Sequence, residues 1–128
     1  MWRHSKKSRN MSHFEINPVT NPRVDRSYWA TLSTEEPLHC RSADCGVDGH
    51  ASLSLRYQPT EQCIETRSFG RYLSHLLRES DLDQELLQRI IIDVLSSCHP
   101  EAVAVEAHFE SPEGMAISLS ATHPESLK

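Results

Sequence analysis

The spacing of the apolar residues changes twice along this chain, and that change constrains the fold more than any single motif. From 51 to 57 apolar and polar residues alternate, which predicts a half-buried strand. From 69 to 95 apolar residues recur every three or four positions, which predicts two amphipathic helices that separate near residue 80. From 103 to 109 and from 116 to 121 the alternation returns around a Ser-Pro-Glu-Gly turn, which predicts two further strands.

The stretch 26–33 predicts one more strand, because Tyr28, Trp29, Thr31 and Leu32 favour extended backbone. The order is then strand, strand, helix, helix, strand, strand. Such an order places two helices on one face of a four-stranded antiparallel sheet, an α+β fold. The other face and the edges of this sheet would stay exposed, which is unfavourable unless another subunit covers them. We therefore expect a homo-oligomer.

A chain of 128 residues holds one domain. Residues 1–24 are polar, with prolines at 18 and 22, and we expect a mostly flexible lead-in there. The folded domain is predicted over 25–123, followed by a short tail at 124–128. Met11 opens a second plausible start of translation, so the first ten residues could belong to an overlong reading frame.

The formal net charge of −5 is unevenly distributed. Four basic residues within the first ten give that segment +4, so the remainder carries −9. An acidic body argues against direct nucleic-acid binding, which needs a basic face. No apolar run approaches the ~18 residues of a membrane helix, and no secretion signal follows the basic start. Four cysteines without such a signal are expected to be thiols, and we expect a cytoplasmic protein with no membrane partner.

Residues 34–50 are predicted to form a long polar loop, and loops of this length usually have a function. Its thiols and aspartates are Cys40, Asp44, Cys45 and Asp48, the residue types of nucleophilic and acid–base chemistry. A zinc set is an alternative here, because His39 precedes Cys40 and the spacing Cys40-x₄-Cys45-x₄-His50 brings ligand types together. Cys63 and Cys98 lie among apolar residues, which is typical of core thiols.

The first helix is preceded by Glu65 and begins with Thr66, Arg67 and Ser68. The free N–H groups of a helix start, together with arginine, can hold an anion, and helix capping explains the same residues. For the second helix, Ser80 or Asp81 is a predicted cap, since Asp81 and Gln84 have capping-box spacing. Gln84 is therefore explained either by capping or by a ligand.

The segment from 57 to 73 resembles a known family. Its residues 63–70, Cys-Ile-Glu-Thr-Arg-Ser-Phe-Gly, followed by Tyr72 and Leu73, resemble the pattern Cys-Val-Glu-Ser-Lys-Ser-Leu-Lys and Tyr-Leu. The pattern is that of the NADPH-dependent 7-cyano-7-deazaguanine reductases of queuosine biosynthesis, a tRNA modification pathway. Tyr57, Pro59, Arg89, Ile90, Asp93 and the last hairpin at 112–119 also fit. The likeness covers roughly Cys40 to Leu119.

This resemblance implies a tunnelling fold assembled into an oligomeric barrel, and a small purine-like substrate. By this resemblance Cys40 is the nucleophile, with Cys45 as the second choice, and Asp48 is the acid–base group. It implies substrate binding by Glu65, Asp83 and Gln84, and binding of the cofactor NADPH by Thr66, Arg67 and Ser68. The implied reaction is thiolate addition to the nitrile and reduction to 7-aminomethyl-7-deazaguanine, without a metal.

The sequence departs from the family pattern at several of these positions. An ungapped alignment from Ala51 places the family cysteine on Ser42 and its aspartate on Gly49. The family's Phe-His-Glu becomes Leu-Asp-Gln at 82–84, its last motif lysine becomes Gly70, and its Arg-Gly-Gly becomes Glu-Gly-Met at 113–115. Two alternatives therefore stay open: an archaeosine-type enzyme that adds an amine without NADPH, and a non-catalytic or zinc-bearing oligomer that binds a purine or pterin.

Overall fold

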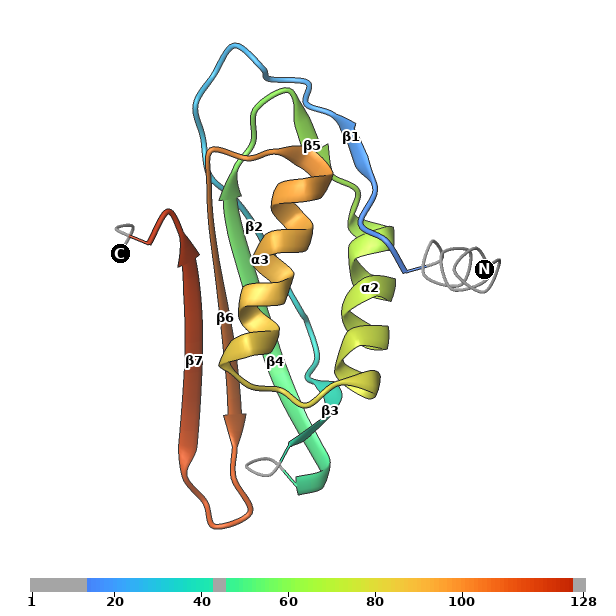
Figure 1. Cartoon of the computed structure of the whole chain (residues 1–128), viewed down its shortest axis with the longest axis vertical. Coiled ribbons are helices and arrows are strands. Elements are labelled where there is room, and N and C mark those ends of the chain that lie inside the picture. The colour runs from blue at the N-terminus through green and yellow to red at the C-terminus, as the bar shows by residue number, and fades with distance from the viewer. Residues whose placement is uncertain (1–13, 43–45, 126–128) are drawn as a thin grey trace, which may run out of the picture.

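Two helices cover one face of an antiparallel sheet in the computed structural model of the protein (Figure 1). The structure describes residues 14–42 and 46–125, with the backbone alone at 41, 42 and 46–48. In chain order the elements are β1 (Pro18–Thr20), β2 (Ala30–Ser33), β3 (Leu38–Ser42), β4 (Gly46–Gln58), β5 (Gln62–Ile64), α2 (Thr66–Glu79), α3 (Gln84–Cys98), β6 (Ala102–Glu110) and β7 (Ala116–His123). The predicted α+β class is confirmed. Neither described helix is long and apolar enough to cross a membrane.

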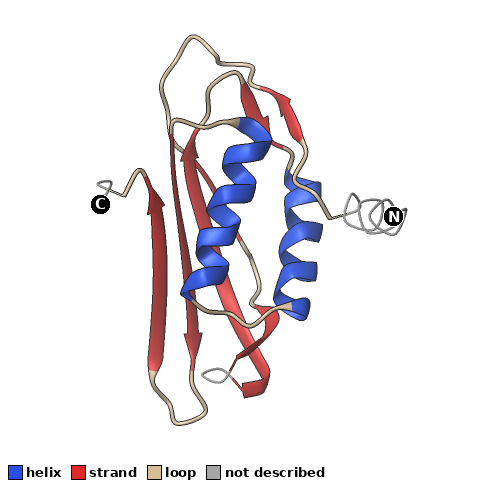
Figure 2. Cartoon of the chain, in the orientation of Figure 1, coloured by secondary structure: helices blue, strands red, loops and turns tan. Residues whose placement is uncertain are grey.

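The long strand β4 organises the sheet. Its first part pairs with β3 and its second part with β2, so these two short strands together form one edge. On its other side β4 pairs with β6, and β6 pairs with β7, which forms the opposite edge. All of these pairings are antiparallel. A separate two-stranded ribbon joins β1 to β5, next to the start of α2 (Figure 2).

The core lies between the helices and the sheet. Every second residue of β4 and β6 points toward the helices, and this alternation matches the predicted half-buried strands. The fully buried side chains are contributed by both layers and include Leu55, Leu77, Leu82, Leu87, Ile90, Val94, Val103 and Val105. In the described part of the chain no buried side-chain nitrogen or oxygen lacks a hydrogen-bond partner.

The sheet face turned away from the helices is hydrophilic. Strand register places mostly hydroxyl-bearing and charged residues on it: Thr31, Ser33, Ser52, Ser54, Arg56, Glu106, His108, Ser118, Ser120 and Thr122. Such a face needs no apolar cover, which removes one of the two reasons to expect an oligomer. The other reason stands, because β7 and the β2–β3 edge each carry backbone groups that no strand within 14–42 and 46–125 pairs. Oligomerisation stays a prediction.

The expected loop over 34–50 is wrong, because most of it forms β3 and the start of β4. The strand β3 turns Leu38 and Cys40 inward and His39 outward, and two inward positions are too few to give a periodic signal. The expected lead-in over 1–24 also contains an ordered part, since β1 pairs with β5 through Val19 and Cys63. Ribbons of three residues per strand are too short to give a periodic signal.

The predicted cap of the second helix is wrong. Asp83 is the cap, and its carboxylate accepts a hydrogen bond from the backbone N–H of Leu86 at 2.9 Å. Because Gln84 is then the first helical residue, it has no capping-box partner in Asp81. Ser80 instead ends the first helix, with its N–H donating to the carbonyl of Leu76.

Candidate functional site

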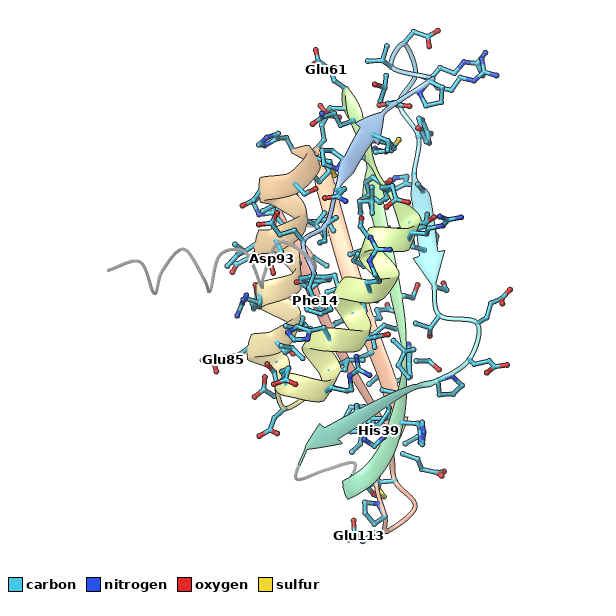
Figure 3. The ribbon with its side chains drawn as sticks, turned by 90° about the vertical axis from the view of Figure 1, so that its right-hand side faces the viewer. Phe14, His39, Glu61, Glu85, Asp93 and Glu113 are labelled. Atoms are coloured by element: carbon cyan, nitrogen blue, oxygen red, sulfur yellow. The ribbon has the colours of Figure 1, made fainter. Side chains whose placement is uncertain are left out.

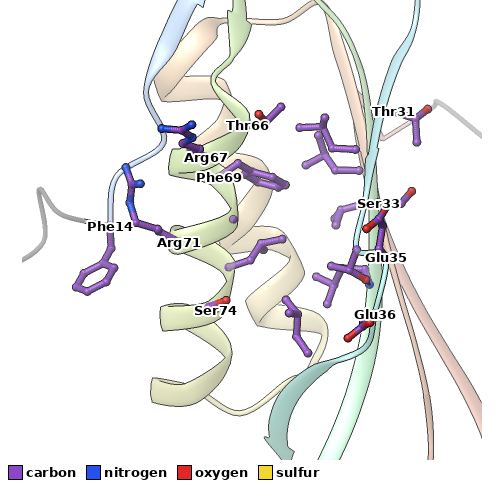
Figure 4. A pocket seen from close by; sticks show the side chains of 18 of the residues that line it. Phe14, Thr31, Ser33, Glu35, Glu36, Thr66, Arg67, Phe69, Arg71 and Ser74 are labelled. Atoms are coloured by element: carbon purple, nitrogen blue, oxygen red, sulfur yellow. The ribbon is translucent and has the colours of Figure 1, made fainter.

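A groove of about 1400 Å³ lies between α2 and the edge formed by β2, β3 and the turn that joins them. Its floor is apolar, with Leu53 and Leu55 of β4 and Phe69 of α2. In Figure 4, Phe69 points from α2 toward the strands, while Glu35 and Glu36 stand on the opposite rim. The groove exists because two helices are too narrow to cover all strands, so the helix-facing side of the β2–β3 edge stays open.

The start of α2 borders this groove and is shaped by Glu65. Its carboxylate accepts hydrogen bonds from the backbone N–H of Ser68 at 2.8 Å and of Arg67 at 3.0 Å. These donors, first that of Ser68, hold the pKa of Glu65 below its usual range. The predicted anion site at this helix start is therefore filled by the protein's own carboxylate.

A strap formed by residues 14–20 holds the same helix start from outside. The backbone N–H of Asn17 donates to the Ser68 hydroxyl at 2.9 Å, and the N–H of Glu65 donates to the Asn17 carbonyl at 2.8 Å. The Ser68 hydroxyl donates in turn to the Glu65 carbonyl at 2.8 Å. Ser68 is therefore a buried link between strap and helix, and its hydroxyl has no donor left for a cofactor.

Three arginines of α2 line the groove: Arg67, Arg71 and Arg78. Within the described residues none of their guanidinium groups makes a hydrogen bond or ion pair, so their donors are available to an anionic ligand. Gly70 lies among them, and a Cβ placed there would meet no atom within 4 Å. The three arginines thus form a positively charged rim along the α2 side of the groove, and Gly70 leaves space for a further side chain within this rim.

The candidate nucleophiles are placed unequally. Cys40 lies on β3 opposite Gly49 and is 0% exposed, within the hydrophobic core. Asp48 belongs to β4, but its side chain is not described, and Cys45 lies outside the described residues.

The zinc alternative is not supported by the described residues. His39 and His50 pair across β3 and β4, with ring centroids 5.6 Å apart (Figure 3 labels His39). Both are exposed, whereas the neighbouring Cys40 is buried on the other side of its strand. Adjacent strand residues point to opposite faces, so His39 and Cys40 cannot bind one ion. No group of three metal-ligating side chains occurs in the described ranges.

The two candidate residues before α3 lie away from the groove. Asp83 uses its carboxylate as the helix cap, and the Gln84 amide nitrogen donates to the carbonyl of Ser120 on β7 at 2.7 Å. Neither residue lines the groove. One chain therefore does not bring Gln84 together with Glu65.

A second cavity of about 580 Å³, which sequence reasoning missed, lies on the outer side of the helix pair beneath the strap. The Tyr72 hydroxyl donates to Asp93 at 2.5 Å, and Arg89 lies 3.4 Å from the same carboxylate oxygen. Phe14 of the strap stacks on His75 with ring centroids 3.9 Å apart (Figure 3 labels Phe14 and Asp93). The spacing of Arg89 and Asp93 on one helix face was the available signal.

Tyr57, at the strand exit before α2, makes stability sensitive to alkaline pH. Burial raises the pKa of its phenol to about 12, and the hydroxyl accepts from the Ile64 N–H at 2.9 Å. The unfolded chain loses this proton near pH ~10, so the free energy of unfolding should fall between about pH 10 and 12. We expect urea unfolding to show a smaller alkaline loss in Tyr57→Phe than in wild type. Equal pH dependence in both proteins would contradict this assignment.

Comparison with known proteins gives three findings. Residues 49–128 match the family model described as QueF-like protein. The NADPH-dependent 7-cyano-7-deazaguanine reductase of Anaeromyxobacter sp. (strain Fw109-5) is 27% identical over 111 residues, covering 87% of this chain and 90% of the relative. The protein of that name from Thermomicrobium roseum is 25% identical over 109 residues, covering 85% and 84%.

A solved structure resembles the fold. It is described as the archaeosine synthase QueF-Like in the apo form, and it matches with a TM-score of 0.56 over 73% of this chain and 91% of that chain. The sequence identity is 15%, so this likeness concerns the fold alone. It confirms the predicted tunnelling-fold architecture.

Proposed function

The chain belongs to the QueF-like protein family, and from this premise we propose that it acts on 7-cyano-7-deazaguanine. The proposed reaction is reduction of the nitrile to the aminomethyl group with NADPH, through a thioimide on cysteine. The observation that carries the proposal is the groove beside α2, where the family signature at 63–73 supplies both apolar surface and arginines.

The groove has the composition that a planar heterocycle needs. Phe69, Leu53 and Leu55 give an apolar floor against which a deazaguanine ring would be buried. Glu65, which adjoins the groove through Thr66 without lining it, and Gln84 are the proposed acceptors for the ring N–H groups. Gln84 keeps one acceptor for this purpose, because its amide nitrogen is already bonded to Ser120 and its Oε1 has no partner in the described chain.

We expect the complete site to need two copies of the chain. Gln84 does not line the groove of its own chain, and among the residues that the structure describes no further strand pairs with either sheet edge. A neighbouring copy that pairs along these edges would supply the missing acceptor. Light scattering after size exclusion should therefore give a mass of several 14.6 kDa chains. A monomer at the concentrations at which the protein binds the nitrile would contradict this expectation.

The residues of α2 fit an anionic cofactor by charge. Arg67, Arg71 and Arg78 line one rim, and their donors are unused within the described residues. We propose that Arg67 and Arg71 hold NADPH phosphates, while Thr66, at the helix start, is the proposed hydroxyl contact. The fit of Ser68 is poorer, because its hydroxyl is buried in the link to the strap. When bound, NADPH would supply the hydride equivalents for reduction.

Replacing Gly70 by lysine should strengthen NADPH binding. The position is inside α2, lines the groove and has free space around its Cβ, so the new ammonium group can join the arginine rim. We expect about tenfold tighter binding in a fluorescence titration, the gain of one charge-assisted hydrogen bond. Gly70→Ala is the matched control: both variants should gain about 0.5–1 kcal/mol of helix stability, but only lysine should gain affinity. Equal NADPH affinity in the two variants would refute the cofactor assignment.

The proposed chemical step uses the Cys40 sulfur. The thiolate adds to the nitrile carbon, and the nitrogen takes a proton from Asp48, which gives a thioimide. Because Cys40 is fully buried, the nitrile can reach it only if β3 shifts relative to α2. Formation of the adduct should therefore be slower than ligand binding.

The test combines intact-mass spectrometry with a cofactor assay. Incubation with 7-cyano-7-deazaguanine should add the mass of one nitrile per reactive chain, and addition of NADPH should give cofactor oxidation and the aminomethyl product. Protein that forms no adduct and consumes no NADPH would overturn the proposal.

A second candidate keeps the thioimide but adds ammonia or another amine in place of hydride, giving an amidine. Gly70 favours it, since the family pattern has lysine at this point of the cofactor motif. Adduct formation and amidine release without NADPH oxidation would establish this candidate and exclude the reductase. Binding without any adduct would favour the non-catalytic alternative.

A further inference from the structure

The open sheet face carries an arginine that is stacked on a tryptophan. Arg56 projects from β4, and its guanidinium carbon lies 4.7 Å from the centroid of the Trp29 ring. Trp29 directly precedes β2 and is 40% exposed. A cation is attracted to the face of an aromatic ring, so the stack restricts where the guanidinium can lie. Arg56 is therefore held in place before any ligand binds.

This guanidinium has no counter-ion among the residues that the structure describes. The Arg56 guanidinium makes a cation–π contact with Trp29. Within 14–42 and 46–125 it makes neither an ion pair nor a hydrogen bond. Glu106 lies on the same face in the neighbouring row, opposite Ser54, but its carboxylate faces His108 at 3.4 Å. Several N–H donors of Arg56 thus remain without an acceptor among these residues.

A hydroxyl group stands beside the arginine. Thr31 is directly opposite Arg56 in the pairing of β2 with β4, so their Cα atoms are about 5 Å apart. Figure 4 shows its side chain turned away from α2, toward the open face. The described residues give the Thr31 hydroxyl no hydrogen-bond partner. On the other side of Arg56, in β6, lies Ala104, whose methyl side chain cannot accept a hydrogen bond from the guanidinium.

We propose that Arg56, Thr31 and Trp29 form a binding site for a phosphate group. An arginine fork matches two phosphate oxygens, and a third oxygen can accept from the threonine hydroxyl. Trp29 holds the Arg56 guanidinium in place, and its fluorescence should change when phosphate binds there. Arg56 lies on the opposite side of the sheet from the apolar groove floor, whereas Thr31, on the edge strand, also lines the groove. The phosphate site is therefore distinct from the floor on which the base of the proposed reaction would lie.

Fluorescence of Trp29 tests the proposal. The chain contains two tryptophans, so the Trp2→Phe variant leaves Trp29 as the single reporter. We expect sodium phosphate, at ionic strength held constant with chloride, to give a saturable change with half-saturation in the millimolar range, about 1–10 mM. Guanosine monophosphate should saturate the same site at an equal or lower concentration, because its phosphate has the same oxygens.

Variants separate this site from general charge effects. Arg56→Gln should weaken phosphate binding about tenfold or more, and Arg56→Lys should weaken it less, because lysine keeps the charge but loses the fork. Thr31→Val should weaken it several-fold, roughly the value of one hydrogen bond. Thr122→Val is the matched control, since Thr122 shares this row but faces Ala104, two strands from Arg56. Its binding should equal that of the parent.

Three results would overturn the proposal: no saturable change with phosphate, the same change with chloride alone, or equal half-saturation in Arg56→Gln and its parent. Circular dichroism melting of each variant shows that it is folded under the conditions of the titration. If Arg56→Gln does not fold, the comparison of Arg56→Lys and Thr31→Val with Thr122→Val decides the matter in the same way.

Discussion

Cys40→Ala is expected to abolish the covalent adduct with 7-cyano-7-deazaguanine and all nitrile-dependent NADPH consumption. Without its sulfur the chain has no group at this position that can add to the nitrile carbon. Intact-mass spectrometry should show the adduct in wild type and unmodified chain in the variant. Because Cys40 is fully buried, the substitution also leaves a small cavity, for which we expect a loss of about 1 kcal/mol in the free energy of unfolding.

The matched control for this experiment is Cys98→Ala. Cys98 is also a buried thiol, on α3, and burial raises its pKa to about 11, so it is a poor nucleophile at neutral pH. The Cys98→Ala variant should lose a similar amount of unfolding free energy and still form the adduct. An adduct that persists in Cys40→Ala would contradict the assignment and move attention to Cys45, whose substitution by alanine should then remove it.

Ser68→Ala should cost about 2 kcal/mol of folding stability, the largest loss we expect from a single hydroxyl in this chain. The substitution leaves the backbone N–H of Asn17 without its acceptor and removes the bond to the Glu65 carbonyl. The loss of these two part-buried hydrogen bonds, about 0.5–1.5 kcal/mol each, is partly offset by the higher helix propensity of alanine. Urea unfolding measures the loss, and amide hydrogen exchange at Asn17 should become faster.

Ser74→Ala provides the comparison on the same helix. Ser74 lines the groove and has no hydrogen-bond partner in the described part of the chain. Its replacement should change stability by less than about 0.5 kcal/mol, toward greater stability. If Ser68→Ala is as stable as Ser74→Ala, the strap is not held to the helix in the way that the structure indicates.

The elements with long apolar periodicity could be predicted from the sequence, because burial of one face leaves a repeated signal. This applies to α2, α3, β6, β7 and the second part of β4. The signal failed at β3, which has only two inward apolar residues, and in the three-residue strands β1 and β5. These short strands are stable because they pair with segments far away in the chain, and such pairing leaves no local pattern.

The residues of the candidate site could be predicted from the sequence, but their hydrogen bonds and burial could not. The sequence indicated a helix start at Glu65 with arginine nearby, and the structure places Arg67 and Arg71 along a groove there. That Glu65 is itself the cap was not expected, since short polar side chains are preferred as caps. The burial of Cys40 depends on β3 and could not be read from a stretch that looked like a loop.

The strap has a consequence for how the protein is made. Its hydrogen bonds join Asn17 to Ser68, 51 residues later, and the Ile16 carbonyl to the Ser97 hydroxyl, 81 residues later. On the ribosome the strap, already synthesised, therefore cannot dock fully until α3 has emerged from the exit tunnel. The strap can close on the helix start once Ser68 has emerged, but its bond to Ser97 forms only when most of the chain has been translated, so the docking of this segment is completed late in synthesis.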